Sequence, residues 1–307
     1  MLCQQIPVLI TWDVDPDRWT TLEKRKSALS ITMDICEKHS AKATFFITAN
    51  FIHEYPVELA RMQAFDHEVG CHGLTHTDEE EYNRMPETMQ RDYIAEATKK
   101  INNVMGRPAK SFRSPRVKTS ACTLRLLSEY GYLADSSICS QRVDFVSSNL
   151  INPGWIRSPR NSYHPDLTNA YRRGSLPIWE VPVSAMGIPF ISNALNALGV
   201  SVMKSFFRLL LVESKQTGKP IVYLGHPTEF IPPSNPKRRR HRPRLKEFSP
   251  SYIRTHGFLL RKILYWMDGK AWLDATQELF AYMASFPDVR FMTVSQYVTN
   301  YLEDTLN

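Results

Sequence analysis

The chain alternates short apolar runs with longer segments whose apolar residues recur every three or four positions. Residues 6–14 (IPVLITWDV) read as a buried strand, and residues 20–40 follow with helical spacing. The same strand-then-helix order recurs in the pairs 41–49 and 56–65, 67–71 and 86–106, 110–115 and 120–132, 177–184 and 200–218, and 219–226 and 271–286, before a last strand at 289–294. This alternation predicts parallel strands with crossover helices, and about seven such steps favour a barrel over an open sheet.

Polar side chains follow several of these strands at the point where each one ends. Asp13 and Asp15 end the first strand, and His72 and His76 follow the strand at 67–71. Arg113 lies in the strand at 110–115, and His226 ends the strand at 219–226. In an α/β barrel the carboxyl ends of the strands form one mouth, where the functional loops lie, so we expect these side chains to converge.

Taken singly, each of these residues has an ordinary structural explanation. Asp15 precedes a proline and is typical of a turn, and an H-x-x-x-H pair such as His72 and His76 is more often structural than metal-binding. Arg113 could form a surface ion pair, and His226 could simply end a strand. Only their shared position at one mouth favours a functional site.

Two imidazoles and one carboxylate are a sufficient ligand set for a catalytic Zn²⁺ that keeps a position open. His72, His76 and Asp15 supply such a set. In an extended chain Asp13 faces the same side as Asp15, so it can serve as the base, with Arg113 holding it ionised. His226 can then serve as the acid.

Five short stretches together resemble the motifs of the polysaccharide deacetylase family, the NodB-homology carbohydrate esterases. In chain order they are TWDVDPD, HEVGCHGLTH, FRSPR, YGYLADSSI and VYLGHPTEF, all within residues 8–230. The resemblance implies a distorted (β/α)₇ barrel and hydrolysis of an N-acyl group. It also implies Asp13 as base, Asp15, His72 and His76 as metal ligands, and His226 as acid.

The resemblance implies that Pro115 and Arg116 of the third motif lie at the substrate. The backbone N–H of Arg116 is expected to donate to the oxyanion. The family usually has tyrosine where Arg116 stands, so its basic side chain is a candidate for substrate contact. Val14 separates the two aspartates, which resembles the D-x-D branch of the family. Asp135 and Glu180 are both candidates for the carboxylate that orients His226.

These observations predict a metal-dependent hydrolase that removes an acetyl or formyl group from an amino sugar of a glycan or lipid-linked saccharide. The first alternative is an amidase for a small non-sugar amide, such as an allantoinase-like enzyme. A second is an Fe(II) oxygenase, because two histidines and a carboxylate also describe its facial triad. A third is a non-catalytic anion-binding module that uses the barrel as a scaffold.

The net charge of +7 comes from one short segment. Residues 237–246, KRRRHRPRLK, hold seven Lys or Arg; without them, 31 basic residues stand against 31 acidic ones. The excess is therefore local, which disfavours a nucleic-acid-binding surface and favours one anion-seeking loop. We expect this loop to be either a solvated insertion or a contact for an anionic membrane surface or a substrate phosphate.

Composition also limits the organisation and location of the chain. Its 307 residues are expected to form one barrel domain, with a basic insertion at about 232–250 and a helical C-terminal extension. The five cysteines are widely spaced without a C-x-x-C motif, and no apolar run approaches the ~18 residues that span a bilayer. We therefore expect a cytoplasmic protein, which would be peripheral to the inner face of the membrane if the basic loop binds there.

Overall fold

A computed structural model describes the chain except for residues 1–4, 18–19, 144–151, 232–247, 257–266 and 304–307. The basic segment at 237–246 lies outside the described residues, so its anion or membrane contact stays a prediction. None of the described helices combines the length and apolar character needed to cross a membrane. The four described cysteines are free thiols.

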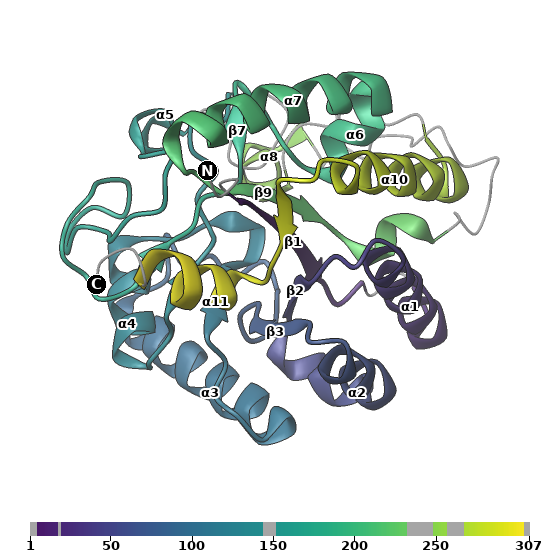
Figure 1. The fold of residues 1–307 in the computed structure, drawn as a ribbon. Helices are drawn as coiled ribbons and strands as arrows, with labels where there is room; N and C mark the ends of the chain where they lie inside the picture. Colours follow the sequence, from purple (N-terminus) through teal and green to yellow (C-terminus); the bar gives the residue numbers. More distant parts are fainter. Residues whose placement is uncertain (1–4, 18–19, 144–151, 232–247, 257–266, 304–307) are drawn as a thin grey trace.

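One sheet of eight strands forms the centre of the molecule, and helices surround it (Figure 1). Its strands are β1 (Ile6–Val14), β2 (Ala43–Ile47), β3 (Glu68–Cys71), β4 (Ser111–Phe112), β5 (Ala134–Asp135), β6 (Trp179–Glu180), β9 (Ile221–Gly225) and β10 (Val289–Phe291). Neighbours follow the order β10-β1-β2-β3-β4-β5-β6, with β9 also paired to β1, and every pair is parallel. The predicted distorted (β/α)₇ barrel is confirmed.

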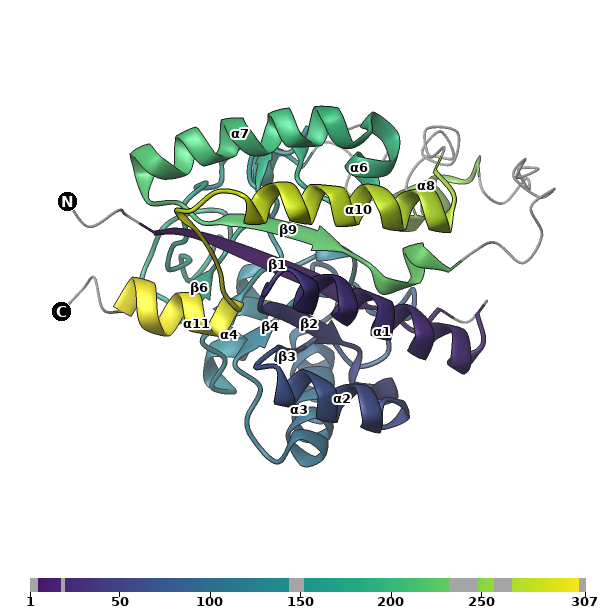
Figure 2. The same ribbon diagram turned by 45° about the vertical axis from the view of Figure 1, so that its right-hand side comes forward.

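The helices occupy the connections between these strands. The α-helices are α1 (Leu22–Lys38), α2 (Pro56–Ala64), α3 (Glu87–Met105), α4 (Ala121–Glu129), α5 (Pro153–Arg157), α6 (Ser192–Leu198), α7 (Val200–Thr217), α8 (Pro250–His256), α10 (Gly269–Ala284) and α11 (Val294–Tyr297). Shorter turns are η1 (Ala49–Glu54), η2 (Pro115–Val117), η3 (Pro227–Phe230) and the π-helical η6 (Val298–Glu303). Figure 2 shows α7 and α10 on the side of β9, with α1 and α2 on the side of β2.

The strand β1 is the most deeply buried element of the sheet. All nine of its residues are buried, because it pairs with β2, β9 and β10 and has helices on its outer side. Such burial on both faces explains why its sequence is a continuous apolar run and not an alternating one. The end of β1, which carries Asp13 and is followed by Asp15, is therefore held rigidly at the mouth of the barrel.

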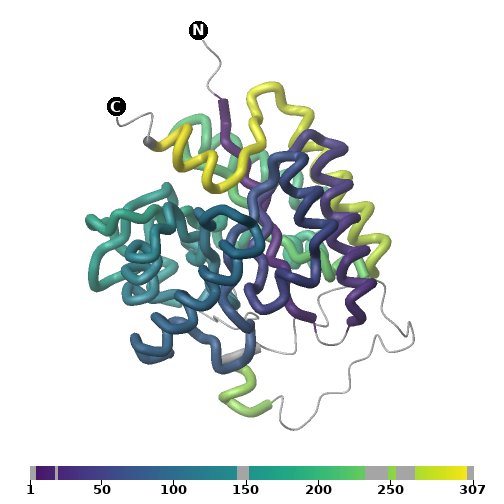
Figure 3. The backbone as a smooth tube through the Cα atoms, turned by 90° about the horizontal axis from the view of Figure 1, so that it is seen from below, coloured from purple at the N-terminus to yellow at the C-terminus, as the bar shows by residue number. Residues whose placement is uncertain are grey.

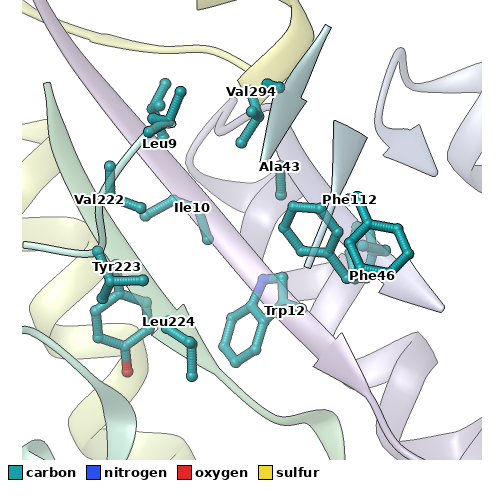
Figure 4. Packing of buried hydrophobic residues seen from close by; sticks show 14 of the residues in the cluster. Leu9, Ile10, Trp12, Ala43, Phe46, Phe112, Val222, Tyr223, Leu224 and Val294 are labelled. Atoms are coloured by element: carbon teal, nitrogen blue, oxygen red, sulfur yellow. The ribbon is translucent and has the colours of Figure 1, made fainter. Parts of the chain in front are cut away.

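The side chain of Trp12 on β1 is the anchor of the core (Figure 4). It is fully buried, and its ring centroid lies 6.0 Å from those of Tyr223, Phe230 and Phe280. A Cβ atom at Gly225 would overlap the Trp12 indole, so β9 approaches β1 this closely only with glycine there. Aromatic packing of this kind holds the first and last parts of the chain together.

The barrel is completed between β6 and β9 by an extended connection and not by a regular strand. The Ser184 N–H donates to the Val222 carbonyl, and the Leu224 N–H donates to the Phe190 carbonyl. A small antiparallel sheet of β7 (Ala185–Met186) and β8 (Ile188–Pro189) lies within this connection. Seen from below (Figure 3), α1, α2 and α10 lie on one side of the molecule and the segment from α5 to β6, in teal, on the other.

Two carboxyl groups face each other inside the barrel, at paired positions of β5 and β6. Asp135 and Glu180 are both fully buried. The Ser137 hydroxyl donates to Asp135 at 2.7 Å, and the Ile138 N–H donates to Glu180 at 3.0 Å. Burial and the charge of Asp135 raise the pKa of Glu180 well above its ordinary value. Glu180 therefore keeps its proton at neutral pH.

Glu180→Gln is expected to gain stability relative to the parent as pH rises from about 5 to about 8. The unfolded glutamate loses its proton above about pH 4.3, whereas the folded one keeps it, so the parent loses up to ~1.4 kcal/mol per pH unit there. Glutamine mimics the protonated form and does not titrate. Urea unfolding of both proteins at several pH values measures the difference.

Glu278→Gln is the matched control for the loss of one charge, because Glu278 is 55% exposed and pairs with Lys204 at the surface. Its stability difference from the parent should change little with pH. A Glu180→Gln protein that loses more stability at pH 8 than at pH 5 would contradict a protonated Glu180 in the folded protein.

Candidate metal centre and active site

The three predicted metal ligands converge at the mouth of the barrel. Asp15 follows β1, and both His72 and His76 lie in the loop after β3. The Asp15 Oδ1 atom lies 3.3 Å from the Nε2 atoms of both histidines, and the three ligand atoms all lie within 4.8 Å of one another. His72 is fully buried and His76 mostly so. Among the described residues this is the group of three that could hold a metal ion.

The hydrogen-bond geometry of these groups suits a cation. The Nδ1 atom of His72 donates to the Arg113 carbonyl at 2.8 Å, so a neutral ring presents its Nε2 lone pair to Asp15. The Asp15 Oδ1 atom is itself buried without a hydrogen-bond partner among the described residues. Lone pairs that face one another repel unless a positive charge lies between them. Donor atoms bound to tetrahedral Zn²⁺ at about 2.0–2.1 Å lie about 3.3 Å apart, so this geometry suits such an ion.

The carboxylate of Asp13 lies directly beside this cluster and is held by Arg113. The Arg113 Nη1 atom donates to Asp13 at 2.9 Å, and Asp13 Oδ2 lies 3.9 Å from the His72 Nε2 atom. Both side chains are almost wholly buried. Asp13 thus lies next to the ligand cluster, but farther from His72 than Asp15 does. This position suits a proton-transfer role beside a bound ion.

Arg113 itself is enclosed by the barrel. Its guanidinium donates to the carbonyl and hydroxyl of Ser136 at 2.6 and 2.7 Å and to the Thr11 hydroxyl at 2.8 Å. The aromatic ring of Phe46 also packs against it, with the ring centroid 4.4 Å from the guanidinium carbon. Because the side chain is 0% exposed, Arg113 positions Asp13 and does not reach a substrate at the mouth.

His226 faces the cluster from β9, on the other side of β1. Its Nε2 atom lies 3.9 Å from Asp15, and its Nδ1 atom donates to Glu229 at 3.0 Å. Burial works against a charged imidazole, but the hydrogen bond to Glu229 raises the pKa of His226 to about 10. A protonated imidazole aimed at the site is suited to donate a proton.

The carboxylate that orients His226 is therefore Glu229, which corrects the expectation of Asp135 or Glu180. Those two groups lie at paired positions of β5 and β6, where burial raises the pKa of both. Glu229 lies three residues after His226, so the short helical turn η3 folds it back onto the imidazole. The spacing H-P-T-E was the signal in the sequence that could have identified it. The Ser192 hydroxyl holds the same Glu229 oxygen at 2.6 Å.

The third motif lies against the loop between the two histidines. Both Arg116 and Val117 have left-handed backbone conformations, with φ of 57° and 52°. The Arg116 guanidinium donates to the Thr77 carbonyl at 3.0 Å and to Asp78 at 2.9 Å. In this structure it braces the loop that carries His76, and substrate contact by this side chain stays a prediction. Pro115 lies against Gly73, where a Cβ would be 2.8 Å from the proline ring.

Comparison with known proteins places this fold and these motifs among related sequences. Residues 4–134 match the family model described as polysaccharide deacetylase. An uncharacterized 30.6 kDa protein of Geobacillus stearothermophilus is 30% identical over 100 residues, 33% of this chain and 37% of that protein. A bifunctional xylanase/deacetylase of Pseudobutyrivibrio xylanivorans is 28% identical over 131 residues, 40% of this chain and 21% of that protein. The chain thus matches well under half the length of these relatives.

Solved structures extend the similarity of fold to nearly the whole chain. A protein of Mycobacterium smegmatis, solved as a candidate polysaccharide deacetylase, has a TM-score of 0.63 at 16% identity and covers 99% of this chain and 93% of its own. Puue allantoinase has a TM-score of 0.62 at 14% identity, with coverage of 98% and 92%. Residues 4–134 are therefore similar to the polysaccharide deacetylase family, and the chain shares its distorted (β/α)₇ fold with these solved structures over nearly its whole length.

Proposed function

We propose that the protein is a metal-dependent hydrolase that removes an N-acyl group, acetyl or formyl, from an amino sugar of a glycan or lipid-linked saccharide. The observation that carries this proposal is the convergence of Asp15, His72 and His76 to 3.3 Å contacts, with Asp13 and His226 on either side. The match to the polysaccharide deacetylase family supports the carbohydrate substrate.

Each residue then has a separate task in the hydrolysis of an amide. Asp15, His72 and His76 hold one divalent ion, most consistent with Zn²⁺, and a bound ion of this kind supplies Lewis acidity and a more acidic water. Asp13, held by Arg113, takes the proton of the attacking water. His226, held by Glu229, gives a proton to the leaving amine, and the backbone N–H of Arg116 donates to the oxyanion of the substrate.

A small non-sugar amide is the second candidate substrate. The similarity of fold to Puue allantoinase over 98% of this chain favours retaining it. The two candidates predict different products: an N-acyl sugar releases acetate or formate together with an amino sugar, whereas a ureide or imide does not. Incubation of the zinc-loaded protein with N-acetyl and N-formyl amino sugars, free and phosphate-linked, and with allantoin, separates them by the products found.

One divalent metal per chain is expected to bind through Asp15, His72 and His76. Elemental analysis of the dialysed parent should show close to one equivalent of metal, and His76→Ala should retain a small fraction of it, because a three-ligand site loses one donor. His39→Ala is the control, since His39 lies between α1 and the start of β2, at the opposite end of the strands from the ligand loop. Full metal occupancy and full activity in His76→Ala would contradict the assignment of His76 as a metal ligand.

Asp13→Asn is expected to lower the turnover rate by ~10² to 10⁴ while leaving most of the metal bound. The amide cannot accept the water's proton, and this range is usual for the loss of a positioned acid or base. Rate and metal content are measured on the same sample, with a thermal melt to verify that Arg113 remains accommodated. A variant that turns over like the parent would make Asp13 structural.

Glu229→Gln should slow hydrolysis of an amide more than that of an ester with a good leaving group. Without its carboxylate partner, the pKa of His226 falls and less of the imidazole carries a proton at neutral pH, and only the amine needs that proton to depart. The ratio of parent to variant rates is compared for an N-acetyl amine and for p-nitrophenyl acetate. Ser192→Ala, which removes only the other hydrogen bond to Glu229, is the control. Equal losses on both substrates would argue against an acid held by Glu229.

A further inference from the structure

The loop that carries both histidine ligands has an unusual backbone. Gly73 has a φ of 70°, and His76, which is not glycine, has a φ of 55°. A side-chain-bearing residue in this left-handed region is uncommon and persists where the surroundings hold it. The conformation of His76 therefore needs a specific source of stabilisation.

The source is the carboxylate of Glu80, around which the loop is folded. Three successive backbone N–H groups, those of Leu74, Thr75 and His76, donate to it at 2.7, 2.6 and 2.6 Å. The hydroxyl groups of Thr75 and Tyr82 donate to it at 2.8 and 2.9 Å. Consecutive N–H groups that converge in this way form a concave anion site, here filled by a side chain of the protein itself.

Glu80 is fully buried, and all the partners that the structure gives it are neutral N–H and O–H groups. Hydrogen bonds to an ionised acceptor are roughly twice as strong as neutral ones, and five of them can compensate for the burial of one charge. The loop is also wrapped tightly around the carboxylate: a Cβ at Gly73 would lie 2.5 Å from the Glu80 Oε1 atom. Glycine at this position is therefore part of the same arrangement.

We propose that Glu80 is a positioning residue of the metal centre, which fixes the backbone from Leu74 to His76 and so aims the His76 imidazole at Asp15. Its negative charge also lies behind the ligand loop, where it favours a cation at the mouth. This inference rests on the metal site of the proposed function and on no property of the substrate. A group of this kind that orients a ligand typically contributes 10- to 100-fold to metal affinity.

Glu81 offers a matched comparison one residue along the chain. Its carboxylate is also buried, with 6% of the side chain exposed, but it pairs with Lys118 at 2.5 Å and Arg84 at 3.1 Å. Glu81→Gln therefore removes a buried charge of similar exposure from the same segment without touching the three N–H groups of the ligand loop. Any general effect of disturbing this segment should appear in both variants.

The test measures metal affinity directly on the full-length chain. Parent, Glu80→Gln and Glu81→Gln are stripped of metal and titrated with Zn²⁺ in competition with a chromophoric chelator. Hydrogen exchange of the 74–76 amides and the melting temperature are recorded on the metal-free proteins. We expect Glu80→Gln to bind Zn²⁺ 10- to 100-fold more weakly and to exchange faster at 74–76, and Glu81→Gln to keep an affinity within about threefold of the parent.

Tyr82→Phe keeps the test informative if Glu80→Gln does not fold, because it removes one donor to Glu80 and leaves the carboxylate in place. It should weaken Zn²⁺ binding in the same direction by a smaller factor. The inference is overturned if Glu80→Gln binds Zn²⁺ as tightly as the parent, or if Glu81→Gln loses as much affinity. A parent that binds no Zn²⁺ overturns the metal site of the proposed function itself, which is a distinguishable result.

Discussion

The buried guanidinium of Arg113 is the constraint on which the mouth of the barrel depends. A charge enclosed in this way is costly unless its N–H groups all find partners, and Arg113 meets Asp13, Thr11 and both oxygens of Ser136. Its backbone carbonyl also accepts the Nδ1 proton of His72. One residue thus joins β1, the strand β4 that it follows, the end of β5 and the first histidine of the ligand loop, so none of these can move independently.

Four carboxylates around the mouth have different environments, and each environment suits one task. Asp13 is held by a guanidinium, whereas Asp15 faces two imidazoles across 3.3 Å. Glu229 supports His226 from behind, and Glu80 is enclosed by the amides of the ligand loop. These groups are oriented by the protein before any ligand arrives, which is the arrangement that lowers the reorganisation needed during a reaction.

Much of the fold and part of the site follow from local patterns in the sequence. The continuous apolar run of β1 and the helical spacing of α1 and α7 reflect burial that each segment requires wherever it packs. The carboxylates that hold the ligand loop and His226 in place were not predicted. Glu80 stands in a run of polar residues and Glu229 in a short turn after a strand, and in neither place does composition distinguish an enclosed carboxylate from a solvated one.

The sequence by itself determined which residues end the strands, because the register of a parallel barrel sends Asp15, His72 and His226 to one mouth whatever the loops do. Only the tertiary structure decided which carboxylate supports which histidine. Asp135 and Glu180 pair with each other across β5 and β6, and the turn after β9 brings Glu229 to His226. The reason is physical: strand ends are placed by backbone pairing over the whole sheet, whereas a side-chain partner is selected by loop conformation and by the competition of nearby donors within about 3 Å.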